Sequence, residues 1–170
     1  MDDRKYTLEK ISYSKKEDCR IMEAVLNSWF QDPKILHLVS PNLTYPFKFK
    51  QWISKNYYNH EKKIITKILK KNNWIIGHLS IRIEENNLHI FHLFIDHEHR
   101  KKGLAKKFFS EVNKIGLILK KPKVSLKVLK KNHAAMQLYL RMGFEKEDQA
   151  KNKIIKMIKY LKNIKSLQLF

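Results

Sequence analysis

A short basic stretch, Arg100-Lys-Lys-Gly-Leu-Ala105, combines residue types that can bind a phosphate group. It lies between an apolar run, Leu88 to Ile95, and an amphipathic segment, Leu104 to Leu117, which are typical of a strand and a helix. A turn between them directs several backbone N–H groups and a helix N-terminus to one place, which attracts anions. Because Gly103 has no side chain, a ligand can approach the backbone closely. The predicted phosphate site comprises Arg100, Lys101, Lys102, Gly103, Leu104, Ala105 and Lys106.

This stretch is not one of the better-known phosphate loops. It lacks the Gly-x-x-x-x-Gly-Lys-Ser/Thr pattern of nucleotide triphosphatases and the three glycines of the dinucleotide fingerprint. A solvated start of a helix is the simpler alternative, and the hexapeptide alone does not decide between the two.

A second pattern, Asn132-x-x-Ala135-x-x-x-Tyr139-x-x-x-Gly143-Phe144, follows one helix and one strand later. Asn132 is a good N-cap, because its side chain can accept a hydrogen bond from the first helical turn. Gly143 suits the left-handed residue that often follows a helix. A capped amphipathic helix explains every residue of the pattern except Tyr139. For Tyr139 the structural alternative is core packing with a hydrogen-bonded hydroxyl.

In this order and spacing, the two patterns resemble the pyrophosphate loop and the following helix of the GNAT family of N-acetyltransferases. The resemblance covers roughly Trp74 to Phe144. Within the family, the sequence resembles the ribosomal-protein alanine acetyltransferase branch. It implies a cytoplasmic enzyme that transfers an acetyl group from acetyl-CoA to a primary amine by direct attack. The amine would belong to a small molecule or a protein N-terminus. No metal is implied, and the enzyme would be a monomer or a homodimer.

The resemblance also implies where the acyl-CoA binds. Two strands, Leu88 to Ile95 and Lys123 to Val128, would run parallel and splay apart around it. Asn132 would help to position it, and the basic loop would hold its pyrophosphate. Its pantetheine amides would pair with the backbone of Leu93, Phe94 and Ile95.

Direct attack needs a proton acceptor and a proton donor, because an amine has a pKa of about 10 and a thiol one of about 8.5. Tyr139 occupies the family's general-acid position. Lys127 stands where the ribosomal-protein branch has a glutamate, so that base is missing. His89 matches the base position of other family members and is our candidate, acting through a water. His92 is the weaker candidate, because strand alternation places it on the opposite face from His89.

The net charge of +20 makes an RNA- or ribosome-associated protein an alternative. Against it, the chain has 31 lysines and only 5 arginines, spread along its whole length. A catalytically silent acyl-CoA-binding protein is the other alternative, motivated by the missing glutamate. The single cysteine, Cys19, excludes an intramolecular disulfide and fits a reducing compartment. The segment His97-Glu-His99 lacks the spacing of a metal site on one helical face.

The patterning predicts one α+β domain over residues 1–170, a three-layer fold with a mixed, mostly antiparallel sheet and helices on both faces. A Pro-rich connection, Gln31 to Phe47, joins the first two helices, and the acceptor is expected to approach over it. Trp29, Phe30, Tyr45 and Trp52 would line either an aromatic acceptor site or the core. The expected strands are Tyr6 to Ile11, Lys63 to Leu69, Trp74 to Ile83, Leu88 to Ile95, Lys123 to Val128, Phe144 to Glu147 and Ile154 to Leu161; the expected helices are Asp18 to Phe30, Phe47 to Tyr58, Gly103 to Leu117 and one from Asn132.

Overall fold

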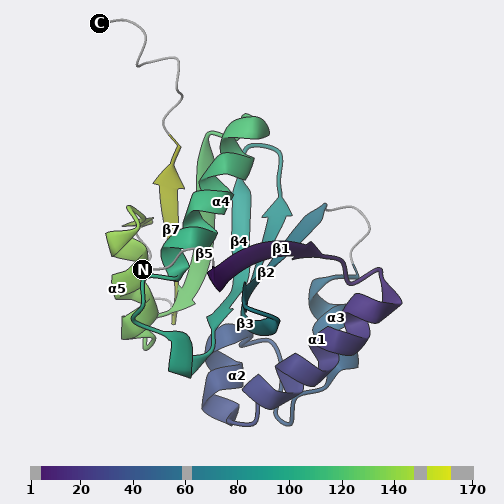
Figure 1. Cartoon of the computed structure of the whole chain (residues 1–170). Coiled ribbons are helices and arrows are strands. Elements are labelled where there is room, and N and C mark those ends of the chain that lie inside the picture. Colours follow the sequence, from purple (N-terminus) through teal and green to yellow (C-terminus); the bar gives the residue numbers. More distant parts are fainter. Residues whose placement is uncertain (1–4, 59–62, 148–152, 162–170) are drawn as a thin grey trace, which may run out of the picture.

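The computed structural model describes residues 5–58, 63–147 and 153–161, and a seven-stranded sheet forms its centre (Figure 1). The strand order is β1-β2-β3-β4-β5-β7-β6, and every pair is antiparallel except β4 and β5. The predicted mixed, mostly antiparallel sheet is therefore confirmed. The strands are β1 (Tyr6–Ile11), β2 (Ile64–Lys71), β3 (Trp74–Ile83), β4 (Leu88–Ile95), β5 (Lys123–Leu129), β6 (Glu145–Lys146) and β7 (Ile154–Tyr160).

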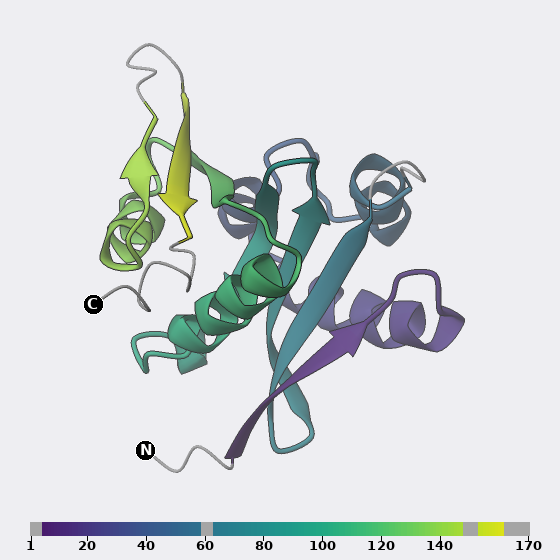
Figure 2. The same ribbon diagram turned by 90° about the horizontal axis from the view of Figure 1, so that it is seen from above.

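Two hydrophobic cores lie on opposite faces of this sheet. The larger packs the sheet against α4 (Ala105–Ile118) and α5 (His133–Arg141), with Phe108 and Leu126 fully buried. The smaller packs the other face against α1 (Lys16–Trp29), α2 (Pro33–Val39) and α3 (Phe49–Asn56). Figure 2 shows α4 in green and α1 in purple on opposite sides of the strands. The expected three-layer arrangement follows from these two cores.

The parallel strands β4 and β5 pair over only part of their length. Leu88, His89 and Ile90 lie opposite Val124, Ser125 and Leu126, and the pairing ends there. Beyond this point β4 continues to Ile95 and β5 to Leu129 without pairing to each other. We call the place where the two strands part the fork. The predicted parallel pairing is confirmed, and the fork leaves one backbone edge of β4 without a strand beside it.

A bulge in β4 follows directly after the fork. His92 has a left-handed backbone with φ of 53°, and the register between β3 and β4 shifts at this place. The extra residue restarts the alternation of side chains along the strand. Leu88 and Ile90 pack in the core under α4, so His89 faces the α1–α3 side, and His92 contacts Tyr57 and Trp52 on that same side. The prediction that His92 lies on the opposite face from His89 is therefore wrong.

Helix α2 is the main element that the sequence did not predict. The segment was expected to be a connection, because two prolines interrupt it. Asp32 instead caps the helix by accepting a hydrogen bond from the backbone N–H of Lys34, and Pro33 takes the first helical position. The other predicted elements are present with ends that differ by a few residues, and β6 is only two residues long. Among the described residues, none of the helices has the length and apolar character needed to cross a membrane.

Candidate functional site

The basic loop has the backbone geometry of an anion site. The backbone N–H groups of five consecutive residues, Lys101 to Ala105, find no acceptor among the described residues. Lys101 and Gly103 have left-handed backbones, with φ of 59° and 72°, so the N–H groups do not simply alternate along an extended chain. Helix α4 begins at Ala105 and no side chain caps it, so its dipole adds positive potential. Such a nest of N–H groups suits a phosphate.

The space in front of Gly103 is open. A Cβ atom placed on Gly103 would have no heavy atom within 4 Å. Two side chains of the loop are engaged elsewhere: Arg100 Nε donates to the carbonyl of Ile95 at 2.7 Å, and Lys102 Nζ donates to the carbonyl of Glu98 at 2.9 Å. The guanidinium of Arg100 also lies 5.1 Å from the ring centre of Phe94. The candidate anion site is thus formed chiefly by the backbone N–H groups, and Arg100 holds the end of β4 next to it.

The backbone of Leu93, Phe94 and Ile95 lies on the part of β4 beyond the fork, which β5 does not pair. Their side chains are divided between the two cores: Leu93 and Ile95 pack toward α4, and Phe94 packs against Trp29. One turn of 3-10 helix (His97–His99) separates these three residues from the N–H nest in the sequence. An extended ligand with a phosphate at one end fits this combination of edge and nest.

Tyr139 lies in α5 with its ring in the larger core. The ring packs against Phe109 and Phe144, with ring centres 6.2 and 6.1 Å apart. The core packing of the structural alternative is thus present, and the hydroxyl forms no hydrogen bond with any described residue. Burial raises the pKa of Tyr139 to about 12. The phenol therefore keeps its proton at neutral pH, as a proton donor must.

Asn132 caps α5 as predicted. Its Oδ1 accepts a hydrogen bond from the backbone N–H of Ala135 at 3.2 Å. Gly143 follows the helix with φ of 82°, and Phe144 behind it is buried. These contacts account for most of the second sequence pattern.

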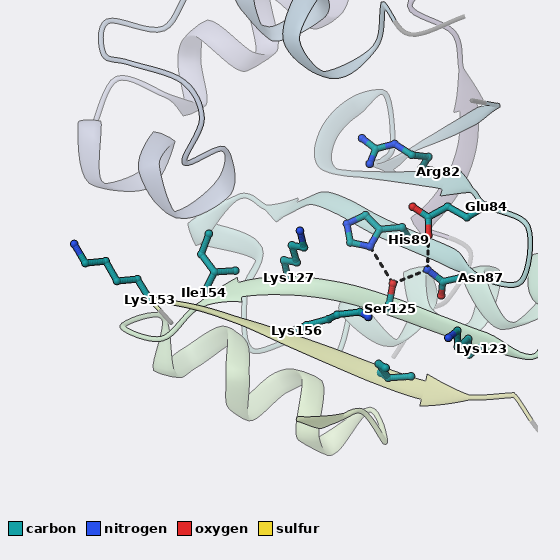
Figure 3. Close-up of a pocket in the computed structure, with 11 residues that line it drawn as sticks. Arg82, Glu84, Asn87, His89, Lys123, Ser125, Lys127, Lys153, Ile154 and Lys156 are labelled. Carbon is teal, nitrogen blue, oxygen red and sulfur yellow. Dashed lines mark hydrogen bonds between the residues drawn. The ribbon is translucent and has the colours of Figure 1, made fainter. Parts of the chain in front are cut away.

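His89 lies at the end of a chain of hydrogen bonds (Figure 3). Its Nδ1 is 3.0 Å from Ser125 Oγ, and Asn87 Nδ2 donates to that same oxygen at 2.7 Å and to Glu84 at 2.8 Å. These hydrogen bonds fix the orientation of the imidazole ring of His89. Burial is the main cause that lowers the pKa of His89 to about 4, with Arg82, Lys127 and Lys156 adding to it. His89 is thus neutral near pH 7 and a weaker base than an unperturbed histidine.

His92 belongs to a buried polar cluster behind the bulge. Its Nδ1 lies 2.9 Å from the hydroxyl of Tyr57 and its Nε2 lies 3.1 Å from that of Ser40. Trp52 stacks on the ring at 3.8 Å. His78 Nδ1 donates to the carbonyl oxygen of His92 at 2.9 Å and so holds the bulge in place. Burial lowers the pKa of His92, and the stack makes it part of the core.

Sequence reasoning missed several of these residues. Ser125 and Asn87 carry no catalytic pattern, and they reach His89 only because β5 pairs with β4 in this register. His78 lies in β3, and its contact with His92 could be predicted only if the position of the bulge were known. Of the four aromatic residues proposed as an acceptor lining, Trp29, Phe30 and Trp52 are buried in the smaller core, and Tyr45 is exposed. Among the described residues, no group of three or more His, Cys, Asp or Glu could hold a metal.

Two pockets open next to the fork. The first, of about 680 Å³, lies over the paired ends of β4 and β5 and contains His89, Ser125 and Asn87 (Figure 3). The second, of about 790 Å³, lies between the end of α2 and the start of α5. Both are lined by Lys153 and Ile154, so they are neighbours. The second pocket lies beside α2, the region over which the acceptor is expected to approach.

A family model described as an acetyltransferase (GNAT) domain matches residues 46–163, which is well over half of the chain. The chain belongs to the GNAT acetyltransferase family. Human N-acetyltransferase 8 is 37% identical over 68 residues, which are 40% of this chain and 30% of that protein. The chain thus covers less than a third of that relative's length.

Solved GNAT structures share the fold of most of the chain. A spermidine N-acetyltransferase from Vibrio cholerae, in complex with CoA and spermine, is 17% identical with a TM-score of 0.69, covering 94% of this chain and 97% of its own. A ribosomal-protein alanine N-acetyltransferase from Escherichia coli is 15% identical with a TM-score of 0.63, covering 97% and 99%. At such identities the likeness shows the GNAT fold alone, and the branch of the family stays a prediction.

Proposed function

We propose that this GNAT protein is an acetyl-CoA-dependent N-acetyltransferase acting on a primary amine in the cytoplasm. The observation that carries the proposal is the combination of two features: five N–H groups that find no acceptor among the described residues, and the edge of β4 that β5 leaves unpaired at the fork. The N–H groups of Lys101 to Ala105 would bind the pyrophosphate, and the backbone of Leu93 to Ile95 would pair with the pantetheine amides. Acetyl-CoA supplies the activated acetyl group as a thioester.

The remaining chemistry falls to residues around the fork. Direct attack forms a C–N bond and breaks the C–S bond, so the amine loses a proton and the thiolate gains one. His89 would take the first proton through a water, held in orientation by Ser125. Tyr139 would donate the second, since its raised pKa keeps it protonated.

No covalent enzyme intermediate is needed, and Cys19 is unsuited to form one. Cys19 lies in α1, and its Sγ donates a hydrogen bond to the carbonyl oxygen of Tyr13 at 3.1 Å. Burial raises the pKa of the Cys19 thiol, which lowers its thiolate fraction.

A silent acyl-CoA-binding protein is the second candidate. Lys127 replaces the glutamate of the ribosomal-protein branch, and His89 is a weak base, since burial lowers its pKa to about 4. Incubation with acetyl-CoA and a panel of amines, followed by CoA thiol release and mass spectrometry, separates the two. An acetylated amine, with CoA released in equal amount, supports the enzyme. Tight acetyl-CoA binding without transfer to any amine class would support the silent protein.

A further inference from the structure

The pocket over the paired ends of β4 and β5 is unusually cationic. Five of its eleven lining residues are Lys or Arg, compared with 36 of the 170 residues in the chain. The fraction of basic residues in the pocket lining is therefore about twice that of the whole chain. Its only carboxylate is Glu84, which accepts a hydrogen bond from Asn87. The five cations are Arg82, Lys123, Lys127, Lys153 and Lys156.

Most of this charge has no carboxylate partner. Lys156 pairs with Glu147 at 2.7 Å. Arg82 instead lies over the ring of Phe91, 4.9 Å from its centre, and forms no ion pair with a described residue. Within the described part of the chain, Lys123, Lys127 and Lys153 form no ion pair. The pocket thus has several charged donors ready for an anion.

The position of the pocket connects it to the acetyl transfer. His89 and Ser125 form one of the three residue pairs between β4 and β5, and the fork opens one pair later. The N–H nest lies beyond the other end of β4, so the two anion-binding regions flank the fork from opposite ends. A ligand in the pocket therefore approaches the fork from the side that the acyl-CoA does not use.

We propose that this pocket binds a carboxylate or phosphate group of the acceptor, so that the substrate is an amine that also carries a negative charge. The inference rests on the proposed function. An Arg and several Lys suit carboxylate and phosphate oxygens alike. A polyamine would meet like charge on most sides, so it is disfavoured here, although the Vibrio cholerae relative was crystallised with spermine.

The properties of His89 agree with such an acceptor. Its lowered pKa makes it a poor base for a lysine-type amine. An α-amine, with an ordinary pKa of about 8, is neutral far more often near pH 7 and needs less help. Amino acids and short acidic peptides combine an α-amine with a nearby carboxylate.

The test uses two peptides that differ in charge and hardly in shape, Ala-Glu-amide and Ala-Gln-amide. Their affinities for the CoA-saturated protein are measured by calorimetry, which needs no turnover. The acidic peptide should bind about tenfold more tightly, as one charge-assisted contact provides. The preference should fall at least threefold in Lys127→Gln and be abolished in the Lys123→Gln/Lys127→Gln double variant. Lys114→Gln, on the exposed side of α4, is the matched control and should keep it.

Two further binding measurements use other ligands. O-phosphoserine against serine shows whether phosphate binds as carboxylate does. Spermidine should bind more weakly than either acidic ligand. Equal affinity for the two peptides, a preference unchanged in the double variant, or tighter binding of spermidine would overturn the inference.

Turnover of the same compounds separates this inference from the proposed function. Acetylation of neutral or cationic amines at rates equal to the acidic ones would contradict the anionic acceptor and leave the enzyme standing. A binding preference for the acidic peptide without acetylation of any compound would support the pocket and contradict the enzyme.

Discussion

His89 and Tyr139 have environments that set their protonation in opposite senses. Burial lowers the pKa of His89 to about 4 and raises that of Tyr139 to about 12, so one is a free base and the other a free acid across the neutral range. The sequence suggested both roles. It did not suggest the lowered pKa, because the burial of His89, which is the main cause, and the nearby cations Arg82, Lys127 and Lys156 depend on how other strands pack around it.

The pH dependence follows from this shift. A titration of His89 near the ordinary pKa of about 6.5 is not expected. From about pH 5.5 to 8, kcat/KM should rise only with the neutral fraction of the acceptor amine, because His89 is already deprotonated there. His89→Ala should lower the rate about a hundredfold with the same profile shape. His97→Ala, an exposed histidine outside the pocket, is the control. An inflection near 6.5, or a fully active His89→Ala, would contradict this assignment.

Removal of the Tyr139 hydroxyl tests the general acid. Tyr139→Phe should lower kcat about a hundredfold and leave acetyl-CoA affinity unchanged, because the ring contacts with Phe109 and Phe144 remain. Its stability should change little, since the hydroxyl has no hydrogen bond among the described residues. Steady-state kinetics with calorimetry measures both. Tyr160→Phe, at a largely exposed tyrosine, is the control. Wild-type kcat in Tyr139→Phe would show that the hydroxyl is dispensable.

At the scale of elements, periodicity located most of the fold. Apolar runs gave β3 and β4 with their observed ends, and the caps Asn132 and Gly143 gave α5. Helix α2 was missed because its seven residues are too few for a periodic signal, although Asp32-Pro33 is a helix-start pattern. The bulge at His92 was missed because no glycine marks the left-handed residue; contacts from Tyr57 and His78 hold it instead.

The start of α5 allows a test of Asn132. Asn132→Ala removes the hydrogen bond to the N–H of Ala135 and should cost about 1 kcal/mol of the free energy of unfolding. If Asn132 also positions the acyl-CoA, affinity measured by calorimetry on the folded variant should fall as well. Asn132→Asp keeps a capping side chain and separates the two effects. Unchanged acetyl-CoA affinity in Asn132→Ala would limit Asn132 to capping.

For the whole molecule, the buried histidines make stability depend on pH. Burial lowers the pKa of His78 to about 4 from 6.5, so the unfolded chain binds more protons than the folded one between these values. The contribution of His78 to the free energy of unfolding is fully present above about pH 6.5 and is lost as pH falls toward 4. For one such group the loss is at most about 1.4 kcal/mol per pH unit.

Urea unfolding at several pH values measures this loss. His78→Gln should be less stable than wild type near pH 7, because it disturbs the contact with His92, and its stability should fall less steeply below about pH 6.5. His133→Gln, at an exposed position, is the control. An unchanged slope in His78→Gln would show that other groups cause the acid dependence.

The acyl-CoA site at the loop from Lys101 to Ala105 can be tested by calorimetry of Gly103 variants with acetyl-CoA. Gly103→Asp places a negative charge in the open space beside the N–H nest. Gly103→Asn has nearly the same shape and also tolerates the left-handed backbone, so the pair isolates charge from strain. We expect wild type to bind acetyl-CoA, the Asn variant to bind it more weakly, and the Asp variant to bind it at least tenfold more weakly than the Asn variant. Equal affinity of wild type and Gly103→Asp would contradict it.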